Sequence, residues 1–472
     1  MSADLLDDQA VVEFIVNGYT LVQTSAAPEF HTRICNELDR IHADEGNPGN
    51  NILPRLPELG QVFASGPVRG ALTSLLGPGY SMHPHRYCHL NRPGSEGQGW
   101  HKDDYVFDQN VRHHRFRWVM AFYYPQDVTA DMGATGIMPG RQFYNTISSS
   151  SATECTETEL KLCGPAGTVA LVNFDVWHRA TPNLSQNNRY MLKFQFLRMT
   201  EPEAPTWNNQ VTAMPKVSSD MHPGLSRDVW RWLQGKSCGG NEGQDVATPL
   251  AALVGGNETE QLDAAYDLGA LGGPAVAPLI EALRQQAQDL LEADLAGNAS
   301  NPQGSNPGEL SAAFALSAVG RPAVQPLVEE LRHKDWRVRA VAADALGNIG
   351  LEAVEAASVL SQCLLDENLW VRRNAAEALG NLEEGAESLA DVLDDDDERV
   401  RRNAALALAK IGSGAAESVP GLVELLRDES RYVRHNAVLA LQRIGTPGSL
   451  QAVVDDLSNA RWCPITSKQS PY

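Results

Sequence analysis

The sequence lacks the features of a membrane or secreted protein. No apolar run approaches the ~20 residues that cross a bilayer, and the start, MSADLLDDQAVVEF, has neither the basic nor the apolar segment of a secretory signal. The seven cysteines never form a CxxC pair, and their odd number argues against a disulfide framework or a structural zinc site. We therefore expect a cytoplasmic protein in a reducing compartment.

Positive charge is also scarce. The chain has 38 Lys and Arg against 59 Asp and Glu, a formal net charge of −21. Residues 1–240 hold 24 acidic and 20 basic side chains, which gives them a net charge of −4. Residues 241–472 therefore carry the remaining net charge of −17. An acidic surface repels nucleic acid and anionic membranes alike. We therefore expect neither as a partner.

The composition changes near residue 240. The first half holds six of the nine tryptophans and short β-rich runs such as GTVALVNFDVW, whereas the second is rich in Ala, Leu and Val at helical spacing. A small, polar, Gly-rich segment, GKSCGGNEGQD, joins them. We predict a multidomain chain with four parts: a first domain over residues 1–234, a linker over 235–247, a helical domain over 248–458 and a tail over 459–472.

A motif of the form VRxxAxxAL recurs in the second half. Its Val-Arg pairs begin at positions 338, 371, 400 and 433, a period of roughly 30 residues that is typical of helical solenoids. A proline-leucine stretch precedes the motif, as in PLVEEL (326–331), so we expect two helices in each unit. The units resemble HEAT repeats of the phycobilisome-lyase type over about residues 250–458. This resemblance implies an all-α solenoid and leaves its function open.

Three candidate metal ligands stand out in the first half. His101 and Asp103 lie in WHKDDYVF, and His178 ends a strand-like run. Two histidines and one carboxylate form a facial triad, typical of non-haem Fe(II), which leaves three positions for a 2-oxo acid and O2. Arg189, eleven residues after His178, is suited to hold the distal carboxylate of 2-oxoglutarate with its guanidinium fork.

The same residues admit other interpretations. Taken alone, His101 and Asp103 fit an ordinary polar strand end. Asp104 is an alternative ligand to Asp103, although residues i and i+2 of a strand share a face whereas i and i+3 do not. The triad interpretation therefore depends on all its members together.

Residues 8–200 resemble the phytanoyl-CoA dioxygenase-like branch of the Fe(II)/2-oxoglutarate oxygenases. Besides the candidate ligands and Arg189, the matching segments are EFIVNGYTLV (13–22), LTSLLGPGY (72–80), HLNRPG (89–94) and MGATGIMPG (132–140). The resemblance implies a double-stranded β-helix, a cupin-like jelly roll with flanking helices, that carries iron at its mouth.

The resemblance also implies roles for individual residues. The implied iron ligands, which form the catalytic centre, are His101, Asp103 and His178. Arg189 would bind 2-oxoglutarate, and Asn91 or Arg92 would add a further contact to this cosubstrate. Phe122 lies where an aromatic side chain of the family flanks the cosubstrate. Strand parity alone does not choose between Asn91 and Arg92.

Two other polar groups have competing explanations. Four side chains alternate on one face of an expected strand and either line a substrate pocket or pack inside the barrel: His83, His85, Tyr87 and His89. A basic cluster either receives an anionic group of the substrate or forms a solvated loop; its members are His113, His114, Arg112, Arg115 and Arg117.

The sequence thus predicts an Fe(II)- and 2-oxoglutarate-dependent dioxygenase that hydroxylates an unactivated C–H bond. We expect a small-molecule substrate or one borne by a carrier or peptide. The HEAT repeats either bind a protein partner or brace the barrel. One alternative is a catalytically inactive barrel in a scaffold protein; another is the same iron chemistry ending in desaturation, epimerisation or cyclisation.

Overall fold

The computed structural model describes residues 4–103, 113–236, 245–295 and 306–459. They divide into two compact units, one formed by the chain up to Gly235 and one by the chain from Lys236 onward, with His113 grouped in the second. The predicted domain boundaries stay predictions. Among the described helices, none combines the length and the apolar character needed to cross a bilayer.

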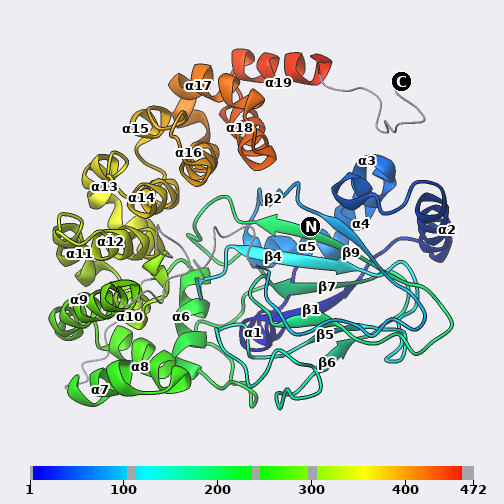
Figure 1. Ribbon diagram of the computed structural model, residues 1–472, viewed down its shortest axis with the longest axis horizontal. Coiled ribbons are helices and arrows are strands. Elements are labelled where there is room, and N and C mark those ends of the chain that lie inside the picture. Colours follow the sequence, from blue (N-terminus) through cyan, green and yellow to red (C-terminus); the bar gives the residue numbers. More distant parts are fainter. Residues whose placement is uncertain (1–3, 104–112, 237–244, 296–305, 460–472) are drawn as a thin grey trace. The chain divides into compact units, whose positions relative to one another are not determined.

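The first unit is built on two antiparallel sheets (Figure 1). The larger sheet contains, in spatial order, β1 (Tyr19–Gln23), β7 (Thr168–Asn173), β4 (Trp118–Tyr123), β9 (Arg189–Leu197) and β2 (Ser81–Met82), with β3 (Tyr87–Asn91) also paired to β9. The smaller sheet contains β6 (Leu160–Leu162), β5 (Thr135–Ile137) and β8 (His178–Ala180). This is the predicted double-stranded β-helix.

The two strands beside the central strand β4 in the larger sheet, β7 and β9, are buried on both faces. Every residue of β7 (TVALVN) and β9 (RYMLKFQFL) is buried, since one face points into the barrel and the other lies under other elements. Both strands are therefore rich in apolar residues, and the polar residues among them, such as Arg189 and Lys193 of β9, are buried.

Helices flank the first unit's sheets, as expected. They are α1 (Asp8–Asn17), α2 (Pro28–Asp44), α3 (Ile52–Arg55), α4 (Gly60–Ala64), α5 (Gly66–Leu76) and α6 (Pro223–Leu233). Asp7 caps α1 by accepting a hydrogen bond from the amide of Ala10. Gly18 ends the helix with a φ of +76°, which a residue with a side chain rarely adopts, and the chain turns directly into β1.

The strand expected across His83, His85 and His89 is interrupted. Met82 pairs with Phe196 and Tyr87 with Lys193, so five steps along this chain match only three along β9. Pro84 lies in the interruption and has no amide hydrogen to continue the ladder. The single-strand prediction was therefore wrong: β3 contains His89, whereas His83 and His85 lie in the connection between β2 and β3.

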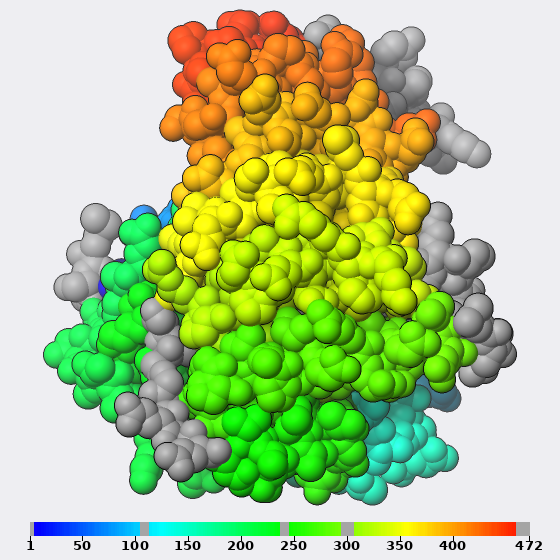
Figure 2. All heavy atoms as spheres, turned by 90° about the vertical axis from the view of Figure 1, so that its left-hand side faces the viewer, coloured from blue at the N-terminus to red at the C-terminus, as the bar shows by residue number. Residues whose placement is uncertain are grey.

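The second unit is an all-α array, as predicted from the repeats. Its helices are α7 (Ala247–Gly255), α8 (Glu258–Leu271), α9 (Gly273–Leu295), α10 (Ser311–Val319), α11 (Val324–Glu330), α12 (Trp336–Ile349), α13 (Ala357–Cys363), α14 (Leu369–Leu382), α15 (Ala386–Ala390), α16 (Glu398–Ile411), α17 (Val419–Glu424), α18 (Arg431–Ile444) and α19 (Pro447–Asn459). Figure 2 shows them as consecutive bands from green to red, in sequence order. The four VRxxAxxAL motifs form α12, α14, α16 and α18, which pack in series.

Small residues let these helices approach closely. A Cβ atom added to Gly347 would lie 2.8 Å from the Cα of Ala378, and one added to Gly380 would lie 2.8 Å from the Cα of Ala407. Such distances are too short for a real contact, so glycine and alanine are required where the helices meet.

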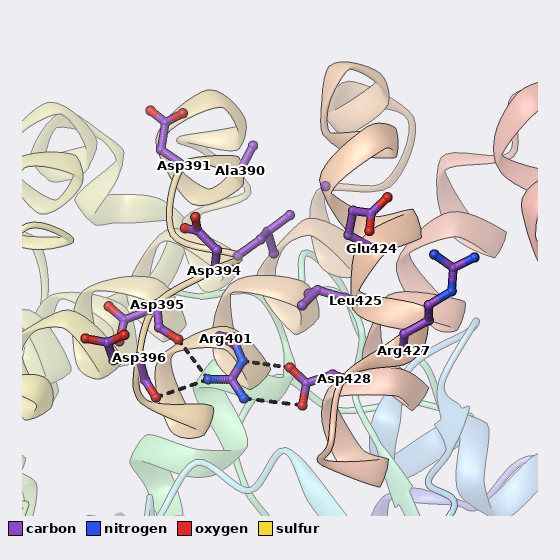
Figure 3. Close-up of a pocket in the computed structure, with 12 residues that line it drawn as sticks. Ala390, Asp391, Asp394, Asp395, Asp396, Arg401, Glu424, Leu425, Arg427 and Asp428 are labelled. Carbon is purple, nitrogen blue, oxygen red and sulfur yellow. Dashed lines mark hydrogen bonds and ion pairs between the residues drawn. The ribbon is translucent and has the colours of Figure 1, made fainter.

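An arginine–aspartate ladder links successive repeats. Its rungs are the ion pairs Arg339–Asp366, Arg372–Asp395 and Arg401–Asp428, each with its shortest N–O distance at 2.7 Å. Arg401 also donates from Nη1 to the carbonyl of Asp395, at 2.8 Å, within its own loop (Figure 3). The arginine of the VR motif therefore closes its own turn and binds the next repeat at the same time.

Candidate metal centre

His101 and His178 face each other across an isolated antiparallel bridge. The amide of His101 donates to the carbonyl of His178 at 3.1 Å, and the amide of His178 donates to the carbonyl of His101 at 3.0 Å. Residues paired in this way project their side chains to the same face. The two ring centroids are accordingly 4.4 Å apart.

The hydrogen bonds of both rings determine which nitrogen faces the site. Nδ1 of His101 lies 3.0 Å from the carbonyl oxygen of Gly99, and Nδ1 of His178 lies 3.1 Å from that of Val176. A carbonyl only accepts, so Nδ1 carries the proton in each ring and Nε2 offers its lone pair. Burial also lowers the pKa of His178 to about 4, which keeps this ring neutral. Such an arrangement is usual for metal-binding histidines.

Asp103 completes the group. One donor atom each from His101, Asp103 and His178 lies within 4.8 Å of the other two, and Oδ2 of Asp103 is 3.9 Å from Nε2 of His178. Burial alone would raise the pKa of the Asp103 carboxyl. The opposing effects of His178 and Lys193 are larger, so the pKa is lowered to about 2. Two imidazole rings and one ionised carboxylate therefore converge, a donor set that could hold a divalent metal ion.

A buried lysine lies beside this group. Lys193, in β9, donates from Nζ to Oδ2 of Asp103 at 2.7 Å, and only 7% of its side chain is exposed. Sequence reasoning missed this residue. The available signal was its spacing from Arg189, since side chains four residues apart on a strand point to the same face.

Arg189 is also buried in the first unit, with 1% of the residue exposed. Its Nε donates to the carbonyl of Gly133 at 2.8 Å, and its Nη2 donates to the same oxygen. Nη1 is buried and has no hydrogen-bond partner among the described residues. One nitrogen of the guanidinium thus remains available for an anionic ligand.

The register of β3 against β9 shows where the two other cosubstrate candidates lie relative to Arg189. Asn91 pairs with Arg189, is 5% exposed and donates from Nδ2 to the carbonyl of Gly133 at 3.1 Å. Arg92 is exposed. Phe122 is buried, and its ring centroid is 6.0 Å from that of His178. Asn91 therefore lies beside Arg189, and Phe122 lies near His178.

Both halves of the chain match known protein families. Residues 14–191 match the family Phytanoyl-CoA dioxygenase (PhyH). Residues 309–380 and 386–462 match HEAT repeats, and residues 261–285 match the PBS lyase HEAT-like repeat. The chain joins a phytanoyl-CoA dioxygenase domain to HEAT repeats. The resemblances found in the sequence are thereby confirmed.

By this match, the first half of the chain contains a 2-oxoglutarate-dependent non-haem iron dioxygenase domain. Its metal is Fe(II), and its cosubstrates are 2-oxoglutarate and O2. No curated protein has a matching sequence.

Several solved structures are similar to part of this dioxygenase. The non-haem, alpha-ketoglutarate-dependent carbocyclase SnoK from nogalamycin biosynthesis is 16% identical over 42% of this chain and 87% of its own, with a TM-score of 0.35. AviO1 from Streptomyces viridochromogenes Tue57 is 17% identical over 41% of this chain and 96% of its own, with a TM-score of 0.34. HygX from Streptomyces hygroscopicus, solved with nickel and 2-oxoglutarate, is 14% identical over 41% of this chain and 88% of its own, with a TM-score of 0.35. At such identities a likeness concerns the fold alone.

Two arginines of the basic cluster, Arg115 and Arg117, fit neither explanation offered by the sequence. Nε of Arg115 forms a 3.0 Å hydrogen bond with Asp228, and Nε of Arg117 forms a 2.7 Å hydrogen bond with Glu201. Because both guanidinium groups are paired and largely buried, they form neither a solvated loop nor a free anion site. Asp104, the alternative iron ligand, lies outside the described residues.

A second group of possible metal ligands occurs in the second unit, with which His113 is grouped. Donor atoms of His113, Asp344 and Glu377 also lie within 4.8 Å of one another. Glu377, however, forms an ion pair with Arg373.

Proposed function

We propose that this dioxygenase holds Fe(II) on His101, Asp103 and His178 and the distal carboxylate of 2-oxoglutarate on Arg189. The observation that carries the proposal is the convergence of the three donor atoms within 4.8 Å. The buried Nη1 of Arg189, which has no hydrogen-bond partner among the described residues, supports the cosubstrate site.

The charges of the side chains suit this task. Asp103 is ionised and the imidazole of His178 is neutral, so the three ligands contribute a single negative charge to a divalent cation. The loaded centre stays cationic and attracts a dicarboxylate, whose far end Arg189 neutralises. Burial of Phe122 beside His178 helps to exclude water from this region.

We further propose hydroxylation of an unactivated C–H bond. When bound, iron and 2-oxoglutarate would supply the oxidising chemistry: 2-oxoglutarate would lose CO2 and become succinate, which takes one oxygen atom of O2, and the substrate would take the other. The protein positions a small-molecule or carrier- or peptide-borne substrate beside the iron, in a cytoplasmic setting. Hydroxylation adds an oxygen atom to the product, whereas desaturation, epimerisation and cyclisation do not.

For the HEAT repeats we propose recruitment of a basic protein segment or a basic carrier. Residues 241–472 carry a net charge of −17. A pocket of about 750 Å³ near α15 and α17 shows this acidity locally (Figure 3). Four of its carboxylates have no ion-pair partner in the described part of the chain: Asp391, Asp394, Asp396 and Glu424. Such a surface steers cations towards it.

Anaerobic binding followed by a substrate screen tests the proposed function. Fe(II) and then 2-oxoglutarate are added to the full-length protein, and the charge-transfer absorbance of the ternary complex is recorded. Candidate substrates are next screened with O2 for succinate formation, and the product mass is measured. Absence of the Fe(II)·2-oxoglutarate complex would favour the inactive scaffold, and a product without added oxygen would overturn hydroxylation.

A further inference from the structure

Two buried nitrogen atoms on paired strands, Nη1 of Arg189 in β9 and Nε2 of His89 in β3, have no hydrogen-bond partner among the described residues. A buried polar atom without a partner destabilises the folded protein, so each of the two calls for an explanation. The proposed function explains the nitrogen of Arg189 by the distal carboxylate of 2-oxoglutarate. It leaves the nitrogen of His89 unexplained.

The register of β3 on β9 puts His89 on the same face as Arg189. His89 pairs with Met191, and the next pair on this face joins Asn91 to Arg189. Side chains of paired residues share a face, and diagonal neighbours lie about 7–8 Å apart, within reach of aromatic and long side chains. A ligand bound at Nη1 of Arg189 is therefore within reach of the imidazole of His89.

The surroundings of His89 favour an anionic ligand. Its pKa is lowered to about 3, first by burial and then by the positive charges of Lys193 and Arg189. These two cations repel a proton on the imidazole, but they attract a carboxylate brought to the same place. The ring of Tyr87 packs against that of His89, with centroids 4.9 Å apart, and restricts its rotation.

Asn91, the other polar residue of β3 beside Arg189, has no further donor to give. Its Nδ2 donates to the carbonyl groups of Gly133 and Thr181, at 3.1 and 3.0 Å, and an amide nitrogen carries two hydrogens. Asn91 thus shares the Gly133 carbonyl with Arg189 and helps to fix it in place. A second donor to the carboxylate has to come from another residue of this face.

We propose that Nε2 of His89 donates a hydrogen bond to the distal carboxylate of 2-oxoglutarate, as a second contact beside Arg189. The inference rests on the proposed function, in which Arg189 holds this carboxylate. A carboxylate has two oxygen atoms, so Nη1 of Arg189 and Nε2 of His89 can each donate to it. In this role His89 binds the cosubstrate and does not hold the metal.

Three substitutions at His89 isolate the contribution of Nε2. His89→Leu removes the donor and keeps an apolar side chain of similar width. The amide nitrogen of His89→Gln can reach the place of Nε2, whereas the shorter amide of His89→Asn can reach only that of Nδ1. The control is His42→Leu, because this half-buried ring lies 5.6 Å from that of Tyr190, whose side chain points to the opposite face of β9 from Arg189.

Each full-length variant is titrated anaerobically with Fe(II) and then with one of two 2-oxo acids. One is 2-oxoglutarate, and the other is 2-oxopentanoate, which has the same carbon chain but ends in a methyl group. The charge-transfer absorbance gives the affinity for each acid, and circular dichroism checks the fold. A loss confined to 2-oxoglutarate reports a contact with the distal carboxylate.

We expect His89→Leu to lose at least about tenfold in 2-oxoglutarate affinity, the scale of one hydrogen bond to a charged group. Its affinities for Fe(II) and 2-oxopentanoate should stay within about threefold of the wild type. His89→Asn should resemble His89→Leu, and His89→Gln should bind 2-oxoglutarate within about threefold of the wild type. His42→Leu should match the wild type throughout. If His89→Leu does not fold, the difference between the Gln and Asn variants carries the test.

Three outcomes would overturn the inference. Wild-type 2-oxoglutarate affinity in His89→Leu would show that Nε2 does not bind this ligand. Equal losses for both 2-oxo acids would place His89 away from the distal carboxylate, and failure of His89→Gln to restore binding would indicate that the ring matters only for packing. Arg189→Ala is titrated in parallel: if it binds 2-oxoglutarate like the wild type, the proposed carboxylate site itself fails, and if it is weakened, only the role of His89 is in question.

Discussion

The imidazoles of His101 and His178 lie on one face because their backbones exchange both hydrogen bonds of an antiparallel bridge, at 3.1 and 3.0 Å. Their Nδ1 atoms are held by the carbonyl groups of Gly99 and Val176. The geometry of the pair is thus set by main-chain pairing, and a change of side chain should leave the backbone in place.

Replacing either histidine by alanine should therefore abolish metal binding without unfolding the protein. We expect His101→Ala and His178→Ala to lower the Fe(II) affinity by more than about a hundredfold, above the 10–100-fold typical of losing an outer-shell partner. Anaerobic Fe(II) titration and circular dichroism measure the two effects. His89→Ala is the matched control, since His89 is neutral with a pKa lowered to about 3 by burial and is not a proposed ligand. Retained Fe(II)-dependent decarboxylation in either ligand variant would contradict the triad.

The carboxylate ligand is tested by comparing two neighbouring aspartates. Asp103→Ala should abolish Fe(II) binding, because its carboxylate lies with the two imidazoles. Asp104→Ala should have a comparatively mild effect on turnover. Both variants are assayed for Fe(II) affinity and for uncoupled succinate formation. Equal loss in both would show that the ligand has been misassigned.

Removal of the Arg189 guanidinium should weaken the cosubstrate and spare the metal. We expect Arg189→Ala to weaken the binding of 2-oxoglutarate by about 2–5 kcal/mol, the range for a buried charge pair that loses one partner. Titration of 2-oxoglutarate at saturating Fe(II) measures this change. Arg92→Ala is the control, because Arg92 is exposed. If Arg92→Ala has the larger effect, the clamp lies elsewhere.

Cutting the chain after Gly235 should separate recruitment from bracing. Under recruitment, residues 1–235 stay folded, bind Fe(II) and 2-oxoglutarate, and lose turnover through a higher KM for the substrate. Turnover of the full-length protein should also fall with rising salt, because steering by the acidic repeats is screened. Aggregation of the truncated protein favours bracing, and full turnover by it contradicts recruitment.

Acid should destabilise the dioxygenase domain through His31. Burial lowers the pKa of this ring, and Nδ1 of His31 lies 2.7 Å from the hydroxyl of Tyr123. The unfolded chain takes up a proton near pH 6.5, whereas the folded domain does so only at lower pH, so the free energy of unfolding falls as the pH drops below about 6.5. His31→Gln should reduce this slope by up to about 1.4 kcal/mol per pH unit. Urea unfolding of metal-free protein measures it; an unchanged slope would show that His31 does not titrate between the two states.

Spacing and periodicity predicted the architecture and the site members that lie on regular elements. The VR motifs gave the helical array, and the residues proposed as iron ligands converge as the facial-triad interpretation requires. The choice between Asn91 and Arg92 needed the register of β3 on β9, which strand pairing determines in three dimensions. Arg115 pairs with Asp228, 113 positions away, and Arg117 pairs with Glu201, 84 positions away. A local sequence pattern does not predict partners at such separations.

The arginine–aspartate ladder makes the HEAT repeats interchangeable parts. Arg401 donates to the carbonyl of Asp395, and Arg434 donates to that of Asp428, six positions earlier in both cases. Excising residues 396–428 would therefore set Arg434 six positions after Asp395, with the Arg372–Asp395 rung still upstream. The array can thus lose or duplicate one repeat and still form the same arginine–aspartate contacts. The length of the array can therefore change in evolution while the catalytic domain stays the same.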